Sequence, residues 1–131
     1  MRSISICLSI AFLVGCENST VEPPTIEVDL TKLAPEAAAA ITTMHGQATT
    51  HPNDVTIWRN LGMLYQAHGL DEAAIGVYDH IAHTSSDPQA TYLQATAHAR
   101  IGQYEEALRL AAQISNYVPA LWKQGFWLLD R

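Results

Sequence analysis

The sequence predicts an all-α fold, a short α-solenoid of antiparallel helix pairs with about six helices. One observation is an internal repeat, because residues 69–75 (GLDEAAI) align without a gap to residues 102–108 (GQYEEAL), 33 positions later. Each copy reads as a turn followed by a helix, and a period of this length is typical of helical solenoids. The other observation is that strong helix formers at 36–41 (EAAAAI) follow Pro35, which suits the first turn of a helix.

The six helices are expected at regular positions along the chain, separated by short turns. Their expected ranges are 36–50, 55–68, 71–84, 88–101, 104–117 and 119–130. The first of these precedes the repeats and is expected to act as the second helix of an earlier pair. We therefore place one helical domain at 35–131.

Composition excludes several classes of protein. The chain has 131 residues and a net charge of -6, and its seven Lys and Arg form no basic stripe, so a nucleic-acid partner is not expected. A hydrophobic content of 48% is too high for a disordered acidic tail and suits a globular core. A small helical domain remains.

Residues 1–15 have the pattern of a signal peptide. Arg2 precedes an apolar run over residues 4–14, and such an eleven-residue run would rise only about 16 Å as a helix, against roughly 30 Å for the bilayer core. Residues 13–16 (LVGC) resemble the lipobox of bacterial lipoproteins, which implies cleavage before Cys16 and lipidation of that cysteine. An ordinary secretory signal with an incidental cysteine is the alternative.

Cleavage and lipidation would determine where the mature protein is located, its net charge and whether it keeps a free thiol. Because Glu17 and not Asp follows the cysteine, the resemblance implies the outer membrane, facing the periplasm, of a Gram-negative cell. Loss of residues 1–15 removes Arg2 and no acid, so six basic residues face thirteen acidic ones for a net charge of -7. Cys7 leaves with the signal, so no thiol remains for a disulfide.

Residues 16–34 are interpreted as the lipidated cysteine and a flexible tether. The segment after Cys16 combines Ser, Thr, Asn and charges with the pair Pro23 and Pro24, and it shows no helical period. Its eighteen residues, 17–34, span at most about 60 Å when extended. The tether is expected to let the domain stand clear of the membrane.

The repeats carry the spacing of a known family. Counted from Val55, the six matching positions of a 34-residue frame are 4, 7, 8, 11, 20 and 24, occupied by Trp58, Leu61, Gly62, Tyr65, Ala74 and Tyr78. This pattern resembles the tetratricopeptide repeat (TPR), with copies at about 55–87 and 88–120 and an incomplete third at 119–131. The second copy keeps Ala95, Gly102, Ala107 and Pro119, and Gly125 opens the third; Thr91, Gln94 and His98 depart from the family pattern, so looser packing is expected there.

Several of these positions have a physical reason. Small residues such as Gly62 and Ala74 let two helices approach closely, while Trp58 and Tyr78 fill the space beside them. Gly69 and Gly102 supply the left-handed turn that follows a first helix. We assign all of them to structure and not to chemistry.

The resemblance implies a peptide-binding groove lined by the first helix of each pair. The residues at the family's groove positions that we single out are Arg59, Met63, Gln66, Tyr92, Thr96, Trp122 and Phe126. For the aromatic members, packing between repeats is the alternative role. The family's carboxylate-binding Lys and Asn pattern is absent, and the surface suits apolar side chains of a peptide.

No catalytic or metal site is expected. His80 and His83 lie three apart on one helix, but a third ligand is not evident, and a solvated helix face is the simpler interpretation. Ser85 and Ser86 near His83 lack an orienting carboxylate, and no phosphate-binding or hydrolase motif is present. We expect no cofactor and no enzymatic activity.

The sequence therefore favours a lipid-anchored TPR adaptor or scaffold that binds a protein or peptide in the bacterial cell envelope. The apolar last helix leaves two alternatives open. It could mediate a homodimer in a self-associating lipoprotein of outer-membrane or pilus assembly, or the chain could be a piece of a longer repeat protein.

Overall fold

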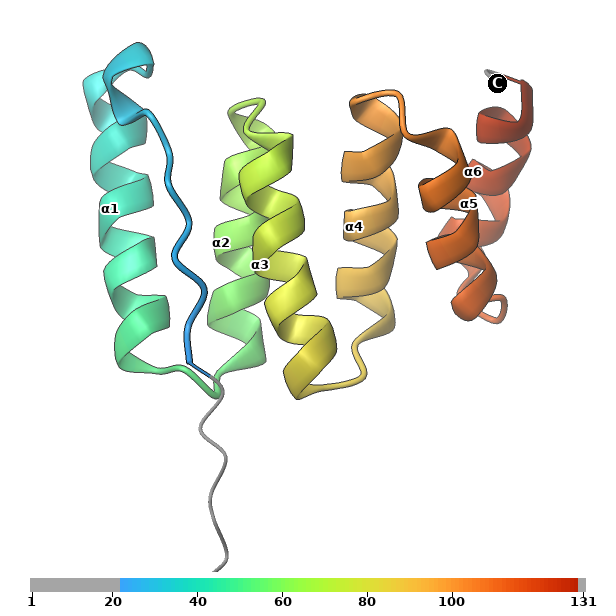
Figure 1. Ribbon diagram of the computed structural model, residues 1–131, viewed down its shortest axis with the longest axis horizontal. Helices are drawn as coiled ribbons and strands as arrows, with labels where there is room; N and C mark the ends of the chain where they lie inside the picture. The colour runs from blue at the N-terminus through green and yellow to red at the C-terminus, as the bar shows by residue number, and fades with distance from the viewer. Residues whose placement is uncertain (1–21, 130–131) are drawn as a thin grey trace, which may run out of the picture.

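A computed structural model describes residues 22–129, and within them the chain is all-helical, without strands. Its elements are a 3-10 turn and six α-helices (Figure 1), namely η1 Leu30–Lys32, α1 Pro35–Thr50, α2 Val55–Ala67, α3 Asp71–Thr84, α4 Pro88–Arg100, α5 Tyr104–Gln113 and α6 Val118–Leu129. This confirms the predicted all-α helical-repeat fold. The predicted signal peptide and Cys16 lie outside the described residues. None of the described helices has the length and apolarity to cross a bilayer.

The helices form a row in which each packs against the next (Figure 1). They alternate in direction, as short turns between neighbours require. In addition α2 contacts α4, and α4 contacts α6. The first helices of the successive pairs thus lie beside one another, and together they form a continuous face that we call the α2–α4–α6 face.

Local sequence fixes where the helices begin and end. The Asp54 carboxylate caps α2 by accepting hydrogen bonds from the backbone N–H groups of Thr56 and Ile57, and Asp87 caps α4 in the same way. The chain leaves α2 and α4 through Gly69 (φ +74°) and Gly102 (φ +82°), conformations that glycine adopts without strain.

The core consists of two clusters of different composition. The first, over α1–α4, contains large side chains that are almost wholly buried, including Trp58, Leu61, Tyr65 and Tyr78. The second, over α4–α6, is built around alanines and is closed by Leu110, Ile114 and Trp127. Every residue of both clusters, and everything packed on them, lies between Ile26 and Trp127.

The second half of the expected tether is part of the fold. Ile26, Val28, Leu30 and Leu33 pack against the first core cluster, and the segment runs along α1 beside the α2–α3 pair (Figure 1). We call residues 26–33 the strap. The reason is an alternation of apolar and polar residues (IEVDL) with period two, which places Ile26, Val28 and Leu30 inward. The expectation of a free tether over 17–34 is therefore corrected for residues 26–33.

The fifth helix is shorter than expected. It ends at Gln113 instead of continuing to 117, because the Ile114 and Tyr117 amides bond to carbonyls only three residues earlier and form a tight turn. Pro119, which has no N–H, then sits in the first turn of α6.

At Gly62 the backbone of α2 lies against the Tyr78 ring of α3, more closely than a side chain on α2 would allow. We therefore expect this position to accept no residue other than glycine without loss of stability. A Cβ at this position would lie 2.5 Å from Cε1 of the fully buried Tyr78 ring. Gly62→Ala is therefore expected to lower the free energy of unfolding by about 1–3 kcal/mol, measured by chemical denaturation.

Gly46→Ala in α1 is the matched control, since nothing lies within 4 Å of its Cβ position. This variant is expected to raise the stability by about 0.5–1 kcal/mol. Equal effects of the two substitutions would contradict the described contact between α2 and α3.

Candidate peptide-binding face

The α2–α4–α6 face is hollowed between α2 and α4. This hollow has a volume of about 380 Å³ and is lined by Met63, Gln66, Ala67, Tyr92, Leu93, Thr96 and Arg100. Its floor is held by α2 and α4, whose caps and core contacts fix their relative position. The result is a shallow depression with an aromatic ring, a thioether and a guanidinium on its walls.

A second hollow of about 210 Å³ adjoins the first between α4 and α6. Its lining residues are Thr96, Ala99, Arg100, Tyr104, Lys123 and Trp127. Thr96 and Arg100 line both hollows, so the two hollows adjoin along α4 on the α2–α4–α6 face. We call the two adjoining hollows together the inner groove.

The structure brings four of the seven predicted groove residues together. Met63, Gln66, Tyr92 and Thr96 line the same hollow. Arg59 does not, because its guanidinium pairs with the Asp87 carboxylate that caps α4, and both side chains are largely buried. Trp122 and Phe126 line a separate hollow on α6 with Gly125 and Leu129.

Gln66 has a structural role in addition to its place in the groove. It is 8% exposed, and its Oε1 accepts a 2.7 Å hydrogen bond from the Tyr78 hydroxyl while its Nε2 donates to the Leu93 carbonyl at 3.2 Å. One amide thereby connects α2 to α3 and α4. Burial also raises the pKa of the Tyr78 hydroxyl, which therefore remains a hydrogen-bond donor at neutral pH.

Sequence reasoning missed the two cations of the groove. Arg100 donates from Nη1 to the Gln66 carbonyl at 3.0 Å and lies 3.4 Å through Nε from the buried Asp71 carboxylate. Burial raises the pKa of Asp71, and the positive charge of Arg100 opposes this shift. Helical spacing offered the signal, since Arg100 lies one turn after Thr96.

Lys123 is the second missed cation. It is exposed on α6, one turn before Trp127, and makes no ion pair with any described residue. The other four cations of the described region, Lys32, Arg59, Arg100 and Arg109, each lie against a carboxylate. Lys123 therefore keeps its charge available to a ligand in an otherwise acidic protein.

Tyr92 combines the two roles left open by the sequence. Its ring lies 5.6 Å from that of Tyr117 at an angle of 56°, a tilted aromatic contact between α4 and the turn before α6. It also faces the inner groove. Partial burial raises the pKa of its hydroxyl. Its position is thus fixed before any ligand arrives.

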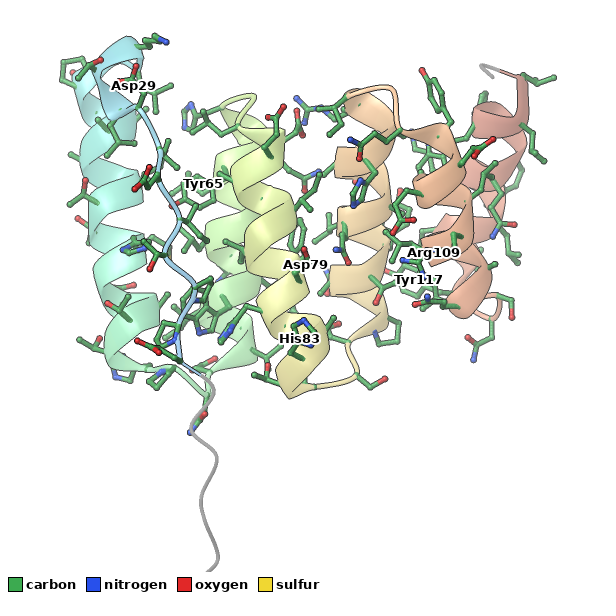
Figure 2. All side chains as sticks on the ribbon, in the orientation of Figure 1. Asp29, Tyr65, Asp79, His83, Arg109 and Tyr117 are labelled. Carbon is green, nitrogen blue, oxygen red and sulfur yellow. The ribbon has the colours of Figure 1, made fainter. Side chains whose placement is uncertain are left out.

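The two histidines of α3 lie in different environments. His80 is 5% exposed, and its ring centroid lies 4.5 Å from that of Trp58. His83 is exposed near the C-terminal end of α3 (Figure 2). Within residues 22–129, no three His, Cys, Asp or Glu side chains gather closely enough to hold a metal ion.

Comparison of the sequence with protein-family models and with curated proteins finds no match to this chain.

Burial of His80 makes the stability of the protein dependent on pH. Desolvation lowers the pKa of its imidazole below the usual value of 6.5. A hydrogen bond with the Pro52 backbone partly opposes this shift, and the charge of His83 makes a smaller lowering contribution. The unfolded chain then binds a proton that the folded chain does not, so stability is present above the unfolded-state pKa and falls as the pH drops below it. The slope approaches about 1.4 kcal/mol per pH unit.

We expect denaturant melts between pH 7 and pH 5 to show a smaller loss of stability in His80→Gln than in the wild type. His68→Gln changes an exposed imidazole that does not contribute to the pKa shift of His80, and it serves as the control, with the wild-type dependence. A pH dependence that is identical in wild type and His80→Gln would disprove this assignment.

Proposed function

We propose that this chain is a lipid-anchored, non-catalytic adaptor of the TPR type that binds a peptide segment of a partner protein in the bacterial cell envelope. The observation that carries the proposal is the inner groove, in which Met63 of α2, Tyr92 of α4 and Trp127 of α6 lie beside the two cations Arg100 and Lys123. The all-α repeat supports the adaptor role, because such folds present extended faces to polypeptides.

The groove favours a particular kind of peptide. Its thioether and aromatic walls suit apolar side chains. Lys123, which pairs with no described carboxylate, lies where a carboxylate of the same peptide would neutralise it. We therefore propose a partner segment that alternates apolar or aromatic residues with an acidic group. This adds a charged element to the apolar preference expected from the sequence.

The experiment is selection from a random-peptide library on residues 17–131, followed by affinity measurements on variants. Selected peptides are expected to combine an apolar residue with Asp, Glu or a free C-terminus. Lys123→Glu is expected to weaken binding about tenfold.

Lys32→Glu makes the same charge change at an exposed lysine that pairs with Asp29, far from the groove, and is expected to leave the affinity unchanged. Peptides that lose affinity with Trp122→Glu but not with Lys123→Glu would place binding on the other side of α6. That result would refute the inner groove as the site.

The anchor is tested separately in a bacterial host fed with a clickable fatty acid. Cys16→Ser is expected to abolish labelling and to release the protein from the membrane fraction, because the thioether-linked lipid has no attachment point and several chains are needed for stable anchoring. Cys7→Ser, within the predicted signal peptide, is the matched control and is expected to retain the label. Labelling that persists in Cys16→Ser would exclude the proposed lipidation.

A further inference from the structure

The outer side of α6 carries almost all of the exposed large apolar side chains in the described region. Six of the seven lie on this helix, with Met63 the exception. We call them the α6 patch: Val118, Leu121, Trp122, Phe126, Leu128 and Leu129. Trp122 is 73% exposed and Leu129 is 83% exposed. A patch of this kind marks an interaction surface.

Helix geometry puts the whole patch on one side of α6. At 100° per residue its six members fall within an arc of about 160°. Ala120 and Trp127 point the opposite way and are buried in the second core cluster. Lys123 lies about 60° outside this arc and lines the inner groove instead, so the patch itself carries no charge.

The area of the patch is that of a stable interface. Aromatic side chains bury roughly 150–250 Å² each and aliphatic ones somewhat less, so with the exposed fractions of the six residues, complete burial of the patch would cover on the order of 700 Å² per molecule. A standard interface takes roughly 800 Å² from each partner. The exposed apolar area of α6 alone is thus close to the area that one partner contributes to a standard interface.

We propose that a second copy of this chain covers the α6 patch, in an isologous dimer formed by α6 against α6. Figure 1 shows α1 and α6 at opposite ends of the row. Head-to-tail stacking would press the α6 patch onto α1, whose described residues include no exposed large apolar side chain. Among residues 22–129, only α6 of another copy offers an apolar surface of matching extent. The absence of charge in the patch avoids repulsion between two acidic molecules.

The shape of the patch is also self-complementary. Trp122, Phe126 and Leu129 surround a hollow of about 290 Å³ over Gly125. Nothing lies within 4 Å of the Cβ position of Gly125. One helix thus carries both bulky aromatic side chains and a hollow that receives them, which is the arrangement that antiparallel packing about a two-fold axis near Gly125 requires.

This dimer extends the proposed adaptor function. Its formation is independent of that function, and only its biological use rests on it. Because the patch and the inner groove are on different sides of α6, both grooves stay accessible. The dimer then presents two peptide sites and gains avidity for a partner with repeated motifs.

Sedimentation equilibrium of residues 17–131, from about 1 to 200 µM, tests the dimer directly; this segment contains both core clusters whole. The wild type is expected to be a dimer. Trp122→Glu is expected to raise the dimer dissociation constant at least about 30-fold, because it places a charge in the interface. Met63→Glu alters the other exposed apolar residue and is expected to leave the dimer intact.

Circular dichroism establishes that Trp122→Glu remains folded, which its high exposure favours. Gly125→Cys then tests the symmetry, since residues 17–131 contain no other cysteine and, within a two-fold dimer, two equivalent thiols lie within bonding distance only near the axis. Oxidation is expected to give a covalent dimer, whereas Gly46→Cys gives none.

A wild type that remains monomeric throughout, or a dimer that survives Trp122→Glu, would overturn the proposal. Association through Gly46→Cys disulfides but not Gly125→Cys would do the same. These measurements need no peptide, and Lys123→Glu lies outside the patch, so failure of the dimer and failure of the peptide groove are separate results.

Discussion

The contact of Tyr78 with Gly62 sets the geometry on which the rest of the structure depends. Because Gly62 has no side chain, the tyrosine ring lies directly on α2 and brings α2 and α3 together. The same ring ends in a hydroxyl that donates to Gln66, and Gln66 in turn donates to α4. The close packing of α2 on α3 therefore also fixes the position of α4, through these two hydrogen bonds. The position of α4 relative to α2 in turn defines the inner groove.

The two core clusters divide the molecule into unlike halves. Large rings fill the first, whereas the second depends on alanines and on Trp127 at the end of the row. Few bulky side chains hold α6, yet α6 supplies Lys123 to the groove and the α6 patch to the outside. A helix with only two buried side chains, Ala120 and Trp127, thus takes part in both proposed surfaces.

The sequence predicted the helices well because their signals are local. The turn glycines at 69 and 102 each act within a few residues of chain, and α2 and α4 end just before them. The 33-residue offset shows that the same local pattern occurs twice. The strap was not predicted because residues 26–30 have no helical period; their apolar members Ile26, Val28 and Leu30 alternate with polar residues at period two. The pairing of Arg59 with Asp87 and the opening of Arg100 and Lys123 onto one groove depend on contacts between repeats, which spacing within one helix does not specify.

The strap also changes how far the proposed anchored domain can travel. Nine residues, 17–25, separate Cys16 from the first packed side chain, where a free tether would have eighteen. The maximum reach from the bilayer falls from about 60 Å to about 30 Å. Halving the radius reduces the volume that the domain can sweep by roughly eightfold and raises its local concentration by the same factor. The domain could then bind only those partners that come close to the membrane surface. By shortening the free linker, the strap would exclude partners that stay farther from the bilayer.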